Sequence, residues 1–213
     1  MHLISINIGA EQPIQIGGKP DTTGIFKQPA SGAVTVTTLG LAGDAVCDTK
    51  NHGGPDQAVY IYGQGDYDWW AQELDQALPP GTFGDNLTIS ELESAGFNVG
   101  DRLHIGEVIL EVTAPRIPCG TLSARMGDKM FVKRFRAAGR PGLYCRVIRT
   151  GSISTGDPVR VEACAGPTVS IGEMYRNHFL PDDETFLRRC LAAPIAIRAR
   201  EDMEAKLRNL VEP

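Results

Sequence analysis

The sequence has no long apolar run and no closely spaced pair of cysteines. Its 213 residues contain no stretch of the length that a membrane helix requires, and residues 1–7 lack the basic and apolar regions of a secretory signal. We therefore expect a cytoplasmic protein without a membrane partner. The five cysteines form no Cys-x-x-Cys pair and the four histidines show no ligand spacing, so neither a disulfide framework nor a zinc site is indicated.

Basic residues are too few for a protein that binds nucleic-acid polymers. The chain has 21 lysines and arginines against 26 aspartates and glutamates, which gives a net charge of −5. Neutralising a phosphate backbone generally requires an excess of basic residues, so we expect no nucleic-acid partner. Hydrophobic residues make up 42% of the chain, enough for the core of a soluble globular protein. The length suits one large domain, or one domain with a small appendage.

Short strand-like segments separated by glycine-containing turns fill residues 1–163. The alternation in Val34-Thr35-Val36-Thr37 is typical of a half-buried strand. Strands are expected at residues 3–8, 33–39, 58–62, 102–105, 108–114, 143–150 and 158–162. Many strands with few helices predict a mainly β fold, a β-barrel-like domain that is closed or partly closed.

Helical patterns are fewer. Apolar residues at spacings of three and four predict a helix over residues 65–78, which Pro79-Pro80 ends, and a second helix is expected over residues 122–138. Residues 168–213 have a different character, with a capping-box pattern in Ser170-Ile171-Gly172-Glu173. We expect a small C-terminal three-helix module there. Helices this short are marginal alone, so the module should pack on the barrel or on a partner.

Cys119 has the most unusual setting of the five cysteines. Pro115 and Pro118 restrict the backbone before it, Arg116 can lower the pKa of its thiol, and amides of the following helix can stabilise a thiolate. Such a thiolate can act as a nucleophile or as a soft metal ligand. A buried, inert thiol is the alternative interpretation. We keep that alternative for Cys47, Cys145, Cys164 and Cys190.

Three further segments suit a ligand, and each has a plainer interpretation. Gly53 and Gly54 beside His52 allow close approach of a backbone, and His52 can serve as an acid, a base or a hydrogen-bonding wall, although a polar turn explains the same residues. Residues 22–27 combine hydroxyls, glycine and lysine, which suits an anion or a solvated loop. The basic residues between 129 and 140 indicate either a wet helix face or a phosphate pocket.

In their order along the chain, several segments resemble the MOSC domain, the molybdenum cofactor sulfurase C-terminal type, and most closely its YiiM-like branch. The resemblance covers residues 1–163, and the tail is similar to the helical module that follows the domain in this branch. The matching segments are residues 23–27, 40–44, 52–60, 83–87, 115–119 and 142–147. Two positions depart from the family: Asp85 replaces a glutamate, and Asn51 stands where relatives often carry a basic residue or histidine.

The resemblance implies a barrel-like domain that binds the molybdenum cofactor, molybdopterin with its metal. The invariant cysteine of the family falls on Cys119, which ligates molybdenum in relatives that reduce N-hydroxylated compounds. Chemistry and motif position then suggest phosphate contacts from Arg116 and Lys27, and a backbone wall for the pterin at Gly53 and Gly54. Thr23 and Asn86 are the expected hydrogen-bonding partners, and His52 is expected to assist catalysis.

The activity implied is reduction of a small N-hydroxylated substrate such as 6-hydroxylaminopurine. The chain shows no iron–sulfur cysteine cluster or flavin fingerprint, so we expect an external electron donor, a flavin or iron–sulfur reductase. Pyridoxal phosphate is not expected as a cofactor. The sequence is compatible with a homodimer. Two alternatives remain at this stage: a molybdopterin or sulfur carrier without turnover, and a cysteine-dependent hydrolase with His52 as its base.

Overall fold

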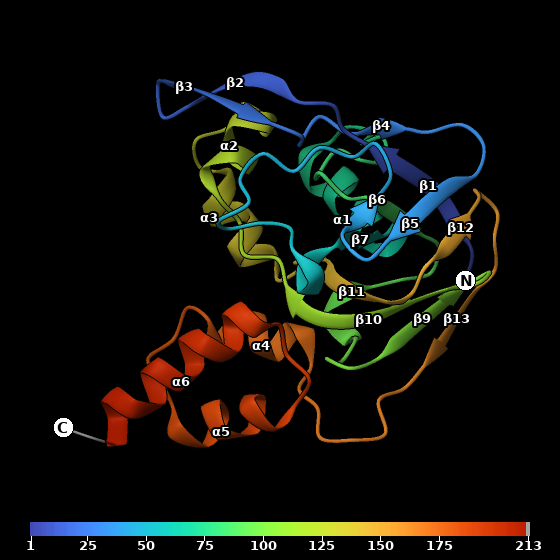
Figure 1. Ribbon diagram of the computed structural model, residues 1–213. Coiled ribbons are helices and arrows are strands. Elements are labelled where there is room, and N and C mark those ends of the chain that lie inside the picture. The colour runs from blue at the N-terminus through green and yellow to red at the C-terminus, as the bar shows by residue number, and fades with distance from the viewer. Residues whose placement is uncertain (212–213) are drawn as a thin grey trace.

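The computed structural model describes residues 1–211, and most of its strands join one eight-stranded sheet (Figure 1). In sheet order the strands are β13 (Val159–Glu162), β9 (Arg102–Ile105), β10 (Val108–Pro115), β11 (Leu143–Arg149), β7 (Val59–Gly63), β8 (Leu87–Ile89), β1 (Leu3–Ile8) and β4 (Gln28–Pro29). Neighbouring strands are antiparallel except β7 and β8, which are parallel.

The sheet curls toward closure without completing it. Strands β13 and β4 stand at its two edges and do not pair with each other. The start of β1 nevertheless reaches the start of β13, because His2 bridges Pro158 and the Leu3 N–H donates to the Asp157 carbonyl at 2.9 Å. The fold of residues 1–211 is therefore mixed and sheet-rich with several helices, and the expected barrel is not confirmed as a closed one.

Smaller strand groups complete the β structure. β2 (Gln12–Ile16) and β3 (Lys19–Thr23) form a hairpin that turns at Gly17 and Gly18, both at positive φ, as two-residue hairpin turns require. A three-stranded sheet consists of β12 (Gly151–Ile153), β5 (Val34–Thr37) and β6 (Gly40–Leu41). Strands β1 and β9 begin and end at the predicted residues, whereas the hairpin was not predicted.

Two predicted helices differ from the observed ones. α1 (Gln64–Leu74) ends earlier than expected, because Asp75 adopts a left-handed conformation with φ 50°. The single helix expected over residues 122–138 is two helices, α2 (Gly120–Met126) and α3 (Phe131–Ala138). Gly127, with φ 65°, ends the first by donating its N–H to the Ala124 carbonyl.

The C-terminal segment contains helices α4 (Ile171–Asn177), α5 (Glu184–Ala192) and α6 (Ile197–Val211). The Ser170 hydroxyl accepts the Glu173 N–H at 3.2 Å, so Ser170 caps α4 as predicted, but the Glu173 carboxylate pairs with Arg189 and so only half of the predicted capping box is observed. These helices gather at one end of the molecule, beside β10 and β11 (Figure 1). Residues 212–213 of the expected module lie outside the described range. No helix within residues 1–211 combines the length and the apolarity needed to cross a bilayer.

A cluster of buried aromatic side chains supports the wall of the cavity described below. Trp70 on α1 stacks on Phe135 of α3, with ring centroids 5.8 Å apart and an interplanar angle of 15°. Phe83, in the loop before β8, packs between Trp70 and Tyr62 of β7, at 5.7 and 4.8 Å. All four side chains are fully buried. The cluster therefore holds the loop that carries Phe83 against the main sheet.

Replacing Phe135 by alanine should remove part of this support. Truncating a fully buried phenylalanine costs about 3–5 kcal/mol in the free energy of unfolding, through lost burial and the cavity left behind. The matched control is Leu39→Ala, because Leu39 is 63% exposed and its truncation should change stability by less than about 0.5 kcal/mol. Urea unfolding followed by circular dichroism measures both. Equal stability of the two variants would contradict the assigned core.

Candidate functional site

Cys119 lies in a cavity of about 390 Å³ formed by several distant segments of the chain. The predicted site residues that line this cavity are Thr23, Lys27, His52, Gly53, Asn86, Arg116 and Cys119. Gly54 is the exception among the predicted residues, because it does not line the cavity. A Cβ on Gly54 would stand 3.8 Å from the Arg198 guanidinium, on the side of helix α6.

The Cys119 thiol is more acidic than an ordinary cysteine thiol. The residue stands immediately before α2, where the backbone leaves the rigid Pro115-to-Pro118 segment. Burial raises the pKa of the thiol, but contact with the His52 imidazole, the positive charge of Arg116 and the Leu122 backbone N–H outweigh it and lower the pKa to about 6. Cys119 is therefore mainly a thiolate at neutral pH, the form that binds soft metals.

Arg116 is a buried cation without a carboxylate partner in the described part of the chain. Only 4% of its surface is exposed, and no carboxylate of residues 1–211 forms an ion pair with it. One guanidinium nitrogen donates to the Phe83 carbonyl, the Tyr60 ring centroid lies 5.0 Å from Cζ, and Nε has no partner. Burying an unpaired charge is costly, so this arrangement favours an anion in the cavity.

Lys27 already has a counter-charge. Its ammonium pairs with Asp44, at 2.6 Å from Oδ2, and burial lowers the pKa of Lys27 while Asp44 opposes that shift. The Asn86 side-chain amide donates to the same carboxylate at 2.8 Å, and the Gly9 N–H donates to its other oxygen at 2.8 Å. The predicted phosphate contact from Lys27 thus competes with Asp44. Arg116, in contrast, has no carboxylate partner within residues 1–211.

Tyr144 fixes the orientation of His52. Its hydroxyl lies 3.1 Å from His52 Nδ1, and burial raises the pKa of Tyr144, so the phenol stays protonated. Tyr144 belongs to β11 and pairs with Tyr60 of β7, with ring centroids 5.2 Å apart. Both tyrosines line the cavity. Sequence reasoning missed Tyr144 because a tyrosine in a strand resembles a core residue, and only the sheet register brings it beside His52.

Asp44 and Cys47 were also missed as cavity residues, although both line the cavity. For Asp44 a signal existed, since it ends the family-like segment 40–44. Cys47 was assigned to the inert cysteines, yet it lies in the wall of the same cavity as Cys119. Burial raises the pKa of the Cys47 thiol, so it is mainly protonated at neutral pH and differs chemically from Cys119.

Asp85 and the basic residues between 129 and 140 do not line the cavity. Asp85 is fully buried and accepts hydrogen bonds from the Tyr67 and Thr88 hydroxyls at 2.6 and 2.8 Å, so it joins α1 to β8. None of the basic residues between 129 and 140 lines the cavity, and Arg140 pairs with the buried Asp66 at 2.9 Å. The phosphate pocket considered for that segment is therefore not present beside Cys119.

Of the two cysteines that line the cavity, Cys119 and Cys47, only Cys119 is mainly a thiolate at neutral pH. No group of three or more histidine, cysteine, aspartate or glutamate side chains within residues 1–211 is arranged to hold a metal ion. A metal bound by Cys119 therefore needs further ligands from a non-protein group. The acidic thiolate and the unpaired Arg116 Nε fit a cofactor that supplies such ligands and an anionic group.

We expect Cys119 to react with iodoacetamide with a midpoint near pH 6, because the thiolate is the reactive species. His52→Ala should raise this midpoint, since it removes one of the contacts that lower the pKa. Cys190, whose pKa burial raises to about 11, should remain unmodified at neutral pH and serves as the internal control. Mass spectrometry of the separate cysteine peptides measures both. A Cys119 midpoint near pH 9 would refute the assignment.

Comparison with known proteins identifies the family of this chain. A family model described as the MOSC domain matches residues 48–160. YflK of Bacillus subtilis is 36% identical over 154 residues, 72% of this chain and 70% of YflK. YiiM of Escherichia coli is 32% identical over 184 residues, 84% of this chain and 81% of YiiM.

A protein named Reductase from Gibberella moniliformis is 32% identical over 161 residues, which cover 74% of this chain and 28% of that protein. Among solved structures, YiiM from Geobacillus stearothermophilus matches the fold with a TM-score of 0.79 at 24% identity, over 96% of this chain and 97% of that one. Since the family model spans more than half of the sequence, this chain belongs to the MOSC domain family.

Proposed function

We propose that this protein is a molybdenum-cofactor-dependent reductase of N-hydroxylated compounds. The observation that carries the proposal is the pairing, in one cavity, of an acidic Cys119 thiolate with a buried Arg116 that lacks a carboxylate partner within residues 1–211. A thiolate suits molybdenum, and an unpaired guanidinium suits the cofactor's phosphate. Membership of the MOSC family and the similarity to a protein named Reductase support an enzyme of this kind.

The cavity residues divide into four proposed roles. Cys119 would be the metal ligand, and Arg116 would bind the phosphate. Gly53 would form a backbone wall for the pterin, and it has no room for a side chain, since a Cβ there would approach Val46 to 2.8 Å. Thr23 and Asn86 are the proposed hydrogen-bonding partners of the pterin, for which the Asn86 amide would exchange its bond to Asp44. When bound, the cofactor supplies the two-electron redox chemistry that cleaving an N–O bond requires.

A side chain of the protein, His52, would then supply the proton that the reaction requires. His52 lines the cavity and contacts Cys119, and its Nδ1 is occupied by the Tyr144 hydroxyl. Its other ring nitrogen, Nε2, would hold a proton and donate it to the oxygen that leaves the substrate. Tyr144 would keep the ring in that orientation. This placement supports the proposed catalytic role of His52, and a small substrate such as 6-hydroxylaminopurine is the proposed class.

Electrons would come from a separate flavin or iron–sulfur reductase, and a cytoplasmic location belongs to the same proposal. A carrier that binds molybdopterin or a persulfide without turnover is the second candidate. The acidity of Cys119 is the observation that favours it, because a thiolate also accepts sulfur. Both candidates place the chemistry on the same residue, so turnover distinguishes them.

Molybdenum content and 6-hydroxylaminopurine reduction should be measured together on protein from a cofactor-competent host. Cys119→Ala should lower activity more than about 100-fold, because losing even an outer-shell partner of a metal ligand costs about 10–100-fold. Cys164→Ala is the matched control, since Cys164 does not line the cavity. Bound molybdenum without turnover on any N-hydroxylated substrate would favour the carrier. Equal molybdenum content and activity in Cys119→Ala and wild type would refute both candidates.

A further inference from the structure

The segment that carries His52 is held in place by the C-terminal helix α6. Arg198, the second residue of α6, reaches this segment, residues 49–57, with both terminal guanidinium nitrogens. Nη1 donates to the Gly53 carbonyl at 3.0 Å and to Gln57 Oε1 at 3.1 Å, and Nη2 donates to the Thr49 carbonyl at 2.8 Å. Arg198 thus joins three points of the segment on both sides of His52.

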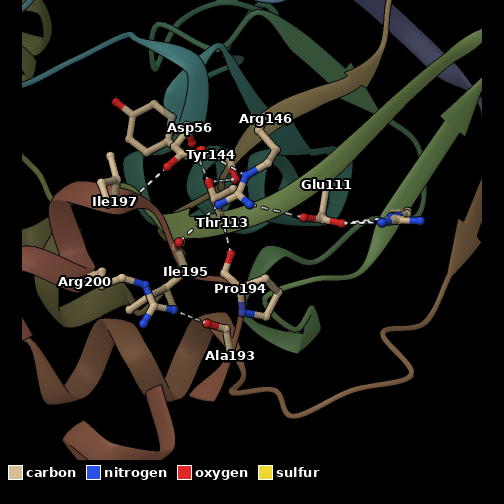
Figure 2. A network of polar contacts seen from close by, with 11 residues as sticks. Asp56, Glu111, Thr113, Tyr144, Arg146, Ala193, Pro194, Ile195, Ile197 and Arg200 are labelled. Atoms are coloured by element: carbon tan, nitrogen blue, oxygen red, sulfur yellow. Dashed lines mark hydrogen bonds and ion pairs between the residues drawn. The ribbon is translucent and has the colours of Figure 1, made fainter. Parts of the chain in front are cut away.

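The same segment binds the start of α6 in return. Asp56 accepts the Ile197 N–H at 2.7 Å, so a residue of the segment caps the helix (Figure 2). The other oxygen of Asp56 pairs with Arg146 Nε of β11 at 3.0 Å. Arg146 also donates to the carbonyls of Pro194 and Ile195, each at 3.1 Å, just before α6. The contacts between segment, sheet and helix therefore form one connected network.

The local bonds around His52 all run to Asp48, on its N-terminal side: the His52 N–H donates to the Asp48 carbonyl at 2.9 Å, and the Asn51 side-chain amide donates to the Asp48 carboxylate at 3.0 Å. Gly53 and Gly54 have positive φ values of 69° and 82°. Glycine adopts many other backbone conformations as readily, so the unrestrained segment would have high conformational entropy. Its regular structure is limited to one short 3-10 turn, η1 (Pro55–Gln57). Charge-assisted bonds from a planar guanidinium are both stronger and more directional than neutral ones. They are well suited to restrain such a segment.

We propose that Arg198 is a positioning residue, which fixes the place of His52 beside Cys119 by bridging Thr49, Gly53 and Gln57. Arg198 does not line the cavity that contains Cys119, so it acts through the segment and not on the contents of the cavity. Helix α6 then supports the site by holding the segment that carries His52. This role depends only on the position of His52 and holds whether or not the protein is a molybdenum reductase.

Arg200 provides a matched control on the same helix. It donates to the carbonyls of Leu191 and Ala193, both at 2.9 Å, and so makes its side-chain bonds within the C-terminal region. Arg198→Ala and Arg200→Ala each remove an arginine with backbone partners from the first turns of α6. Only the first removes contacts to residues 49–57. The full-length chain is used for both variants.

Hydrogen exchange of residues 49–57 tests the proposal, together with the ¹⁵N and ¹H resonances of the His52 ring. Arg198→Ala should speed exchange in this segment by about tenfold or more, because several charge-assisted bonds are lost, and should shift or broaden the His52 signals. Arg198→Lys keeps the positive charge but loses the planar guanidinium that reaches several acceptors, so it should speed exchange by a smaller factor. Arg200→Ala should leave both measurements at wild-type values.

Unchanged exchange in Arg198→Ala, or an equal rise in Arg200→Ala, would overturn the proposal, because the effect would then be absent or a general loosening of α6. If Arg198→Ala fails to fold, Arg198→Lys decides: faster exchange confined to residues 49–57 supports the role, and wild-type exchange there overturns it. Neither measurement depends on metal or turnover, so failure of the proposed function would not produce either result.

Discussion

The cavity is organised around a buried positive charge. Arg116 enters the interior between two prolines, binds the Phe83 carbonyl and lies over the Tyr60 ring, yet no carboxylate in residues 1–211 neutralises it. A buried charge in this state is costly unless a counter-charge lies near. The Cys119 thiolate, three residues along the same rigid segment, is that counter-charge within the chain, and guanidinium and thiolate each favour the charged form of the other.

The rest of the fold holds Arg116 and Cys119 in place, together with His52, which contacts Cys119. The aromatic cluster with Trp70 holds Phe83, whose carbonyl anchors Arg116. Across the cavity, the register of β7 and β11 places Tyr144 against His52. Behind His52, α6 restrains the glycine-rich segment that the sheet does not pair. The helices after residue 168, expected as an appendage, therefore contribute to the site through contacts with sequence separations above 140 residues.

Local features of the site could be predicted from the sequence, and the contacts that arrange them could not. The prolines around Cys119 and the glycines beside His52 are visible in short windows, and Cys119, His52 and Gly53 do line one cavity, whereas Gly54 does not. Alternating apolar residues likewise predicted β1 and β9. The Asp44 partner of Lys27 and the Arg198 contacts depend on folding distant segments together. Missed local signals also exist, since Gly17-Gly18 marks the hairpin and Gly127 divides the helix expected over residues 122–138.

The central claim is that Cys119 provides the protein's own ligand to molybdenum. X-ray absorption at the molybdenum edge, recorded on cofactor-loaded wild-type protein and on Cys119→Ser, tests it most directly because sulfur and oxygen ligands differ in bond length and scattering. The account predicts one sulfur fewer around the metal in the variant, with the sulfurs of the cofactor retained. An identical sulfur shell in the two proteins, or wild-type protein that takes up no molybdenum from a competent host, would contradict it.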